Sequence, residues 1–435
     1  MTDTPTARCR ELLLAGRRGE AELAAAELIA SQFGISVRRA SIGADWTSLN
    51  SVNGIVDEES GERWFFKFHQ EEGEEATVHE YYRAEILQRA GLPVDVPVRV
   101  SRAPGHQVLL YAFRDDRRLA DVCLDVEHSE DGTLLRHIVA LQGDLDRLVG
   151  ETYLRTLHAS NAAQSAGEAI HQLFHYRLRI PSRPRHVAAR VARFYESQVV
   201  RLPGSDRRWD EFSALRWRIN GVPHRHTIAE LFEESLVRLD PAFLGASGAV
   251  TAHGDAHNAN VWIEERTESP RLVLFDPAFA GEHVPALLAD IKATFHNVYA
   301  HRLWLYHPNE AGKLFDVDVA VADGWIDIAH DWALTPLRQA FLSSKIENVW
   351  RPLLAALRDQ GLLPRDWQRI VRCALFCCPT LVTNLRAGEP QGPIPRRSPA
   401  MSALSFSLAV MAGSEPDDAA EDPFTRFIAA ISPAA

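Results

Sequence analysis

Residues 251–262, TAHGDAHNANVW, are the most informative stretch of this chain. Two histidines and an aspartate, His253, Asp255 and His257, stand at alternate positions. If the segment is extended, alternate side chains lie on one face, and all three could bind one metal ion. A second interpretation pairs Asp255 with Asn260 in the catalytic loop of a phosphoryl-transfer enzyme. The two interpretations predict different functions, a metal site in the first and phosphoryl transfer in the second.

The overall composition is that of an ordinary globular protein. The chain has 435 residues, of which 46% are hydrophobic and 24% charged, and this length allows two or three core-forming units. No apolar run approaches the roughly 20 residues that span a bilayer, and charged residues interrupt the N-terminal apolar stretches. We therefore expect a cytoplasmic protein without a membrane partner. The net charge of −11 argues against a nucleic-acid partner.

Two local features have both a structural and a functional interpretation. Three cysteines cluster within residues 373–378 but lack the paired CxxC units of a zinc site, so we expect them to be buried small side chains. The stretch 176–194, YRLRIPSRPRHVAARVARF, is rich in arginine. A solvated surface would explain it, and the alternative is that these arginines face an anionic ligand.

The first quarter of the chain changes from a helical to a strand pattern. Apolar residues at helical spacing predict one helix over 8–32, within an N-terminal unit of residues 1–34. Residues 35–113 predict a small nucleotide-binding lobe of five antiparallel strands with one inserted helix at about 74–90. The expected strands are 35–43, 50–57, 62–69, 97–102 and 107–113.

The rest of the chain, residues 114–435, is mostly helical in pattern, with a long amphipathic helix expected over 134–160. Two short strands, AVTAHG at 249–254 and RLVLFD at 271–276, interrupt it. We expect residues 181–225 to be irregular and residues 283–378 to be helical. The predicted fold class is α+β, with a small sheet lobe followed by a large helical lobe.

Polar residues suited to phosphoryl transfer lie on two of these strands. Lys67 stands within the aromatic segment RWFFKFH, and a strand lysine held by a helix glutamate such as Glu80 can bind nucleotide phosphates. Alternatively, Lys67 points to solvent. Asp276 ends the apolar strand LVLFD, where it either binds Mg²⁺ or is a turn residue. The order along the chain is the one that phosphoryl transfer requires: Lys67, Glu80, Asp255, Asn260 and Asp276.

On these residues the chain resembles the aminoglycoside phosphotransferase and choline kinase-like family, which has the protein-kinase-like bilobal fold. The resemblance spans about 35–310 and is carried by HGDAHNAN at 253–260 and LVLFDPA at 272–278, with support from AGLPVDVP at 90–97 and LRTLHAS at 154–160. It implies an ATP-dependent kinase acting on a hydroxyl of a sugar, an aminoglycoside-like compound, a nucleoside or an amino alcohol. It also suggests a link to antibiotic resistance.

The resemblance implies a role for each residue that it matches. Asp255 would be the catalytic base or would orient the acceptor hydroxyl. Asn260 and Asp276 would bind Mg²⁺, while Lys67, held by Glu80, would contact the phosphates of ATP.

Further residues receive less specific roles from the same resemblance. His253 would brace the loop and His257 would lie close to the site. Adenine would be bound near Tyr111 and Phe113. The segment 161–250 would be an insertion that shapes the acceptor site.

The expected phosphate loop, GADWTSLNSVNG at 43–54, departs from the family because it lacks GxGxxG. Polar side chains that could donate hydrogen bonds in place of glycine amides are Ser48, Asn50 and Ser51.

Two other function classes remain open. A metal-dependent hydrolase would use His253, Asp255 and His257 with further ligands, but would leave Asn260 and Asp276 unexplained. A non-catalytic nucleotide-binding protein would retain the same fold. The acceptor is also open, because the acidic net charge suits a cationic compound and the arginine-rich stretch suits an anionic or sugar-like one.

Overall fold

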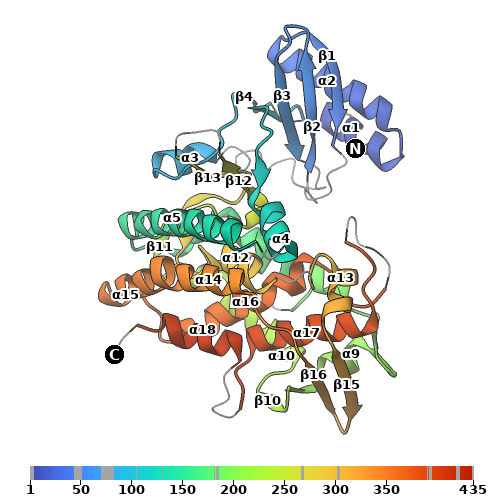
Figure 1. Ribbon diagram of the computed structural model, residues 1–435, viewed down its shortest axis with the longest axis vertical. Helices are drawn as coiled ribbons and strands as arrows, with labels where there is room; N and C mark the ends of the chain where they lie inside the picture. The colour runs from blue at the N-terminus through green and yellow to red at the C-terminus, as the bar shows by residue number, and fades with distance from the viewer. Residues whose placement is uncertain are drawn as a thin grey trace.

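A computed structural model describes residues 4–433, except for the segments 44–50, 70–82, 183–185, 266–268, 301–303, 391–393 and 418–421 and residues 104, 130, 181 and 389. The chain forms a small sheet lobe, at the top of Figure 1, and a larger and mostly helical lobe below it. The predicted bilobal α+β fold is confirmed. Within the described residues, no helix combines the length and the apolar character that crossing a membrane requires.

The sheet lobe is built on five antiparallel strands in the order β1-β2-β3-β5-β4, as the sequence predicts. Alternating apolar residues give the sheet one buried face, on which Val52, Phe66 and Phe68 lie. The strands are β1 (Val37–Ile42), β2 (Ser51–Glu58), β3 (Arg63–His69), β4 (Arg99–Ser101) and β5 (Val108–Ala112).

The N-terminal residues form two helices where we expected one. Helix α1 spans Pro5–Leu14 and α2 spans Arg18–Phe33, and the chain turns between them at Gly16, whose φ of 71° favours glycine. Both helices share a core with the sheet through residues such as Leu12 of α1 and Leu28 of α2, and both lie beside the sheet in Figure 1. Of the helix expected at about 74–90, the described part is α3 (Ala84–Arg89), and residues 70–82 lie outside the described part of the chain.

The helical lobe is organised around one large hydrophobic core. The expected burial of the cysteines of segment 373–378 is confirmed, and these cysteines, Trp217 and Trp304 are all 0–1% exposed. Its longer helices are α4 (Leu119–Ser129), α5 (Gly132–Thr156), α10 (Ile228–Arg238), α14 (Pro336–Lys345), α15 (Arg351–Asp359), α16 (Trp367–Val382), α17 (Pro399–Gly413) and α18 (Pro423–Ile431). Its shorter helices are α6 (Ala162–Ala166), α7 (His175–Leu178), α8 (Arg190–Phe194), α9 (Trp209–Ser213), α11 (Pro241–Leu244), α12 (Ile291–Thr294) and α13 (Pro308–Leu314), and single turns are η2 (Ala169–Leu173), η3 (Asn258–Asn260), η4 (Phe295–Tyr299) and η5 (Ile346–Trp350).

The helical lobe also contains a sheet that the sequence analysis missed. The expectation that 181–225 is irregular and that 283–378 is helical was partly wrong, because hairpins from both regions join in one four-stranded sheet. Residues Asp323 and Gly324, both with positive φ, make the tight turn of one hairpin. The strands of this sheet are β9 (Arg216–Ile219), β10 (Val222–His224), β15 (Val317–Ala322) and β16 (Trp325–His330), and a separate hairpin joins β7 (Val199–Leu202) and β8 (Ser205–Arg208).

The two predicted strands around the HGDAHNAN motif are confirmed. They are β11 (Ala249–Ala252) and β13 (Arg271–Leu274), which pair with β14 (Gly281–Pro285) and β12 (Val261–Glu264), respectively. Strand β6 (Arg117–Arg118), which follows the sheet lobe, pairs with β12. The motif is thus enclosed between short antiparallel pairs that fix its backbone.

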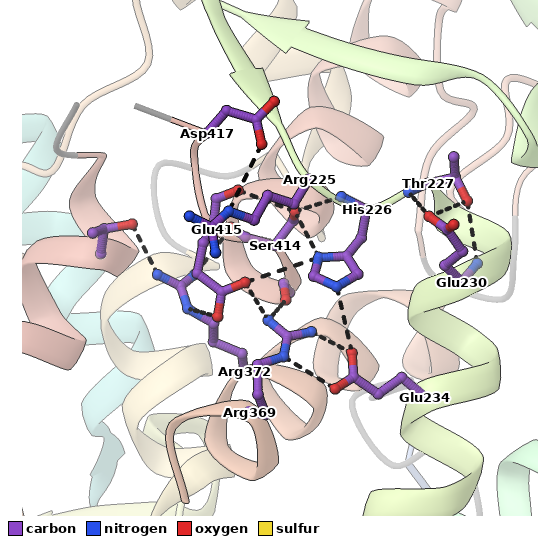
Figure 2. A network of polar contacts seen from close by, with 12 residues as sticks. Arg225, His226, Thr227, Glu230, Glu234, Arg369, Arg372, Ser414, Glu415 and Asp417 are labelled. Atoms are coloured by element: carbon purple, nitrogen blue, oxygen red, sulfur yellow. Dashed lines mark hydrogen bonds and ion pairs between the residues drawn. The ribbon is translucent and has the colours of Figure 1, made fainter. Parts of the chain in front are cut away.

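A polar network holds the C-terminal helices against α10 (Figure 2). Arg369 of α16 donates to Glu234 of α10 over 3.1 Å and to Glu415 over 2.7 Å. The Ser414 hydroxyl accepts from the backbone N–H of His226 over 2.9 Å. Arg372, only 1% exposed, donates to the Ser414 carbonyl over 3.1 Å. These contacts fix the end of α17 against α16 and α10.

Candidate active site

The residues predicted to act together come from three separate elements. Lys67 projects from β3 of the sheet lobe, Asp255 follows β11, and Asp276 follows β13. The Lys67 ammonium and the Asp276 carboxylate form an ion pair that joins the two lobes. Lys67 therefore does not point to solvent, and its side chain is only 10% exposed.

His253 is bonded at both ring nitrogens within the loop. Its Nε2 lies 2.9 Å from the Phe275 carbonyl oxygen, to which it donates, and its Nδ1 accepts from the Asp255 backbone N–H over 3.3 Å. Burial lowers the pKa of His253, so the neutral ring that this pattern needs is favoured. His253 thus ties the loop before Asp255 to the segment before Asp276.

The Asp255 carboxylate is held in place but can accept further hydrogen bonds. Its Oδ1 atom is buried and has no hydrogen-bond partner among the described residues, although Lys292 Nζ lies 3.8 Å away. Its Oδ2 atom lies 3.8 Å from His257 Nε2. The Asn260 side chain donates to the Asp255 backbone carbonyl over 3.0 Å, which bends the loop around the carboxylate. A buried carboxylate oxygen without a partner is suited to accept a hydrogen bond from a substrate hydroxyl.

Asp276 has a backbone conformation that is uncommon for a residue other than glycine, with φ of 56°. Burial opposes ionisation of its carboxylate, but the positive charge and hydrogen bond of Lys67 prevail and hold its pKa below the ordinary value. Asp276 is therefore an anion at neutral pH. Backbone strain of this kind is found at functional sites.

The loop rests on a buried polar layer. Asn297 accepts from the Asn258 backbone N–H over 2.7 Å, and its own carbonyl accepts from Arg338, which is paired with Glu127. Beneath it lies a cavity of about 20 Å³, enough for one water molecule. Its lining includes a buried triad in which Lys345 Nζ lies 2.9 Å from Asp146 and 3.0 Å from Asp290.

A further group at the site was missed from the sequence. Lys292 is 3% exposed, lies beside Asp255, and contacts His296 Nε2 over 2.8 Å. The His296 Nδ1 atom lies 2.8 Å from the Tyr306 hydroxyl. A lysine inside the apolar run ALLADIKATFHNVY at 286–299 was the available signal, because buried lysines are rare without a partner.

Several predicted nucleotide-binding residues cannot be placed against the site. Ser48, Asn50 and Glu80 lie outside the described residues, and Ser51 begins β2. Tyr111 is 6% exposed in β5, while Phe113, just beyond the strand, is 37% exposed. Roles for these residues in phosphate or adenine binding remain predictions.

The geometry disfavours the metal tripod of His253, Asp255 and His257. Both nitrogens of His253 are already bonded, so neither offers a lone pair to a metal ion. Across the part of the chain that the structure describes, no group of three or more His, Cys, Asp or Glu side chains is placed to hold one. Asn260 and Asp276 instead supply the amide and carboxylate oxygens that suit Mg²⁺, which keeps several of its own water or phosphate ligands.

No protein-family model and no curated protein matches the chain. Solved structures do match, at low identity. A spectinomycin phosphotransferase in complex with ADP and spectinomycin is 13% identical over 89% of this chain and 98% of its own, with a TM-score of 0.36. A microcompartment-associated aminopropanol kinase is 13% identical over 90% and 95%, with a TM-score of 0.38. A macrolide 2'-phosphotransferase from Brachybacterium faecium is 14% identical over 92% and 99%, with a TM-score of 0.36.

Proposed function

We propose that this chain is an ATP-dependent kinase that phosphorylates a hydroxyl group of a small molecule. The observation that carries the proposal is the approach of Lys67 to Asp276 across the lobes, next to a loop that holds Asp255 with an unpartnered buried oxygen. A lysine, a metal-binding carboxylate and a carboxylate facing the acceptor are the groups that phosphoryl transfer requires.

In this mechanism the residues act mainly by position and charge. Lys67 would turn from Asp276 to the phosphates of ATP, where its ammonium neutralises negative charge. Asn260 and Asp276 would hold Mg²⁺, which supplies further neutralisation of the phosphate oxygens when bound. Asp255 Oδ1 would accept the hydrogen of the acceptor hydroxyl and align its oxygen with the γ-phosphorus.

The test is Asp255→Asn, assayed by ADP release over a panel of sugars, aminoglycosides, nucleosides and amino alcohols. Turnover should fall by at least about 10³-fold, because the amide cannot accept the proton. Nucleotide binding, read as a thermal shift with ATP and Mg²⁺, should persist. The matched control is Asp318→Asn, an exposed aspartate of β15, which should behave as wild type.

Two outcomes would select another function. Stabilisation by ATP without turnover of any acceptor or of ATP itself would favour a non-catalytic nucleotide-binding protein. Stoichiometric zinc binding without any response to ATP would favour the hydrolase. Turnover of an aminoglycoside in the panel would support a role in antibiotic resistance.

A further inference from the structure

A line of hydrogen-bond donors lies beside Asp255, on residues that the mechanism above does not use. Lys292 Nζ is 3.8 Å from Asp255 Oδ1, a distance too long for a hydrogen bond. One of its three N–H groups is directed to His296 Nε2 at 2.8 Å. The ammonium thus keeps donors for another acceptor while remaining almost wholly buried.

The same chain of contacts sets the direction of the Tyr306 hydroxyl. Burial lowers the pKa of His296 well below its ordinary value, so the ring is neutral at pH 7. Because Nε2 accepts from Lys292, the ring hydrogen lies on Nδ1 and is donated to the Tyr306 oxygen over 2.8 Å. The Tyr306 O–H is then left to donate elsewhere. Lys292 and Tyr306 both present donors.

Charges of both signs act on Lys292. Lys292 is buried, which lowers its pKa, and the positive charges of Arg177 and Arg190 act on it in the same direction, against Asp255. Arg177 also acts on His296 and Tyr306. Both arginines belong to the arginine-rich stretch 176–194, on α7 and near the start of α8.

A purely structural role explains this arrangement poorly. Lys292 forms an ion pair with Asp255 at 3.8 Å without donating a hydrogen bond to it, and its only close contact is with His296 Nε2 among the described residues. A buried ammonium that keeps N–H groups for a further acceptor suits an anion as that acceptor. A cationic acceptor would be repelled by the same ammonium.

We propose that the acceptor carries an anionic group, a phosphate ester or a carboxylate, near the hydroxyl that is phosphorylated, and that Lys292 and Tyr306 bind this group. Arg177 and Arg190 add to the attraction. The proposal rests on the kinase function above and specifies its substrate class, which excludes polycationic compounds as preferred acceptors.

The first experiment measures anion binding by the protein saturated with Mg²⁺ and a non-hydrolysable ATP analogue, so that the γ-phosphate position is filled. Inorganic phosphate and acetate are added as probes, and the thermal shift is compared with that of chloride at equal ionic strength. We expect one or both probes to stabilise the wild type beyond chloride. Phosphate alone would indicate a phosphate ester, and acetate alone a carboxylate.

Variants locate the probe. Lys292→Gln should weaken probe binding about 10-fold or more, because a charged hydrogen bond is lost. Tyr306→Phe should weaken it less, and serves as the second test if Lys292→Gln is poorly folded. Lys313→Gln, an exposed lysine of α13, is the matched control and should leave binding unchanged.

The outcomes separate this proposal from the kinase function. If the ATP analogue does not stabilise the protein, the kinase proposal fails. If the analogue binds but neither probe exceeds chloride, or if both variants bind the probe like wild type, the anionic-acceptor proposal fails alone. Once acceptors are known, kcat of Lys292→Gln can be compared for neutral and anionic acceptors. An equal loss for both classes would mean that Lys292 acts on the transferred phosphoryl group, and this result would also overturn the anionic-acceptor proposal.

Discussion

Lys67 of the sheet lobe and Asp276 of the helical lobe are paired directly, so the two lobes are linked at the position proposed for the metal and the phosphates. The pairing holds the Asp276 carboxylate ionised, as its lowered pKa indicates. A metal ion can therefore bind Asp276 without first displacing a proton, and binding requires only that Lys67 move to the phosphates.

Substitutions of Asp276 and of Lys67 should affect nucleotide binding in different ways. Asp276→Asn should abolish the Mg²⁺-dependent part of the thermal shift with ATP and lower kcat by about 10²-fold or more. Lys67→Met should weaken nucleotide binding both with Mg²⁺ and with EDTA, because its charge acts on the phosphates directly. The measurement is the thermal shift under both conditions. Identical Mg²⁺ dependence of the two variants would contradict this division of roles.

Gly254, within HGD, should not tolerate a side chain. Its φ is 78°, and a Cβ atom would lie 2.7 Å from the Phe279 carbonyl oxygen and 3.0 Å from Ile170 Cδ1. Gly254→Ala should displace the Asp255 loop and reduce kcat/KM by about 10²-fold, since small misplacements at a reacting centre cost this much.

The matched control for Gly254 is Gly324 in the β15–β16 turn. It has the same φ of 78°, but its Cβ would have nothing within 4 Å. Gly324→Ala should lower the free energy of unfolding by about 1 kcal/mol and leave turnover unchanged. If both variants lost the same stability and neither lost activity, the clash at Gly254 would not matter. Steady-state kinetics and urea unfolding of the two variants provide the comparison.

The buried triad under the loop should be sensitive to the loss of its one cation. Lys345 lies between the carboxylates of Asp146 and Asp290, and all three residues are at most 3% exposed. Lys345→Met would leave two buried carboxylates without their cation, so the free energy of unfolding should fall by about 3–5 kcal/mol. Lys313→Met, which replaces an exposed lysine, should change the free energy of unfolding by less than about 0.5 kcal/mol. A similar small loss for Lys345→Met would show that the triad is not maintained in solution.

The strands could be predicted from residues close together in the sequence. Contacts between residues that are distant in the sequence could not. The strand pattern around Lys67 sufficed to predict the five strands, because periodicity and turn residues are local. The roles of the residues in HGDAHNAN remain predictions. The pairing of Lys67 with Asp276 and the approach of Lys292 to Asp255 depend on tertiary packing. The spacing of residues along the chain does not show which distant side chains will be in contact.

One fold error was avoidable. The segment VDVAVADGWIDIAH at 317–330 has Val or Ile at alternate positions on both sides of Asp323 and Gly324, which is a strong hairpin signal, yet we expected helices there. The parallel pairing of its strand β16 with β9, about a hundred residues earlier, was not predictable in the same way. An alternating pattern predicts that a segment is a strand, but it does not say which other strand will pair with it.

The brace formed by His253 should make the loop sensitive to acid. His253 must remain neutral to accept from the Asp255 N–H, and burial keeps its folded-state pKa below the ordinary value of about 6.5. As pH falls below about 6.5, the unfolded chain takes up this proton before the folded chain does. The free energy of unfolding should therefore decrease with falling pH, by up to about 1.4 kcal/mol per pH unit for this one group.

His253→Phe should remove this contribution to the pH slope and the two hydrogen bonds, lowering the free energy of unfolding at pH 8 by about 2–4 kcal/mol and reducing kcat. His330→Phe, on β16, is the control, because burial also lowers the pKa of His330, to about 4. It should flatten the slope in the same way and leave kcat intact. Urea unfolding between pH 5 and 8 gives the slopes. An unchanged slope for His253→Phe would mean that the pKa of His253 is the same in the folded and unfolded chains, and that the loop does not hold its ring neutral.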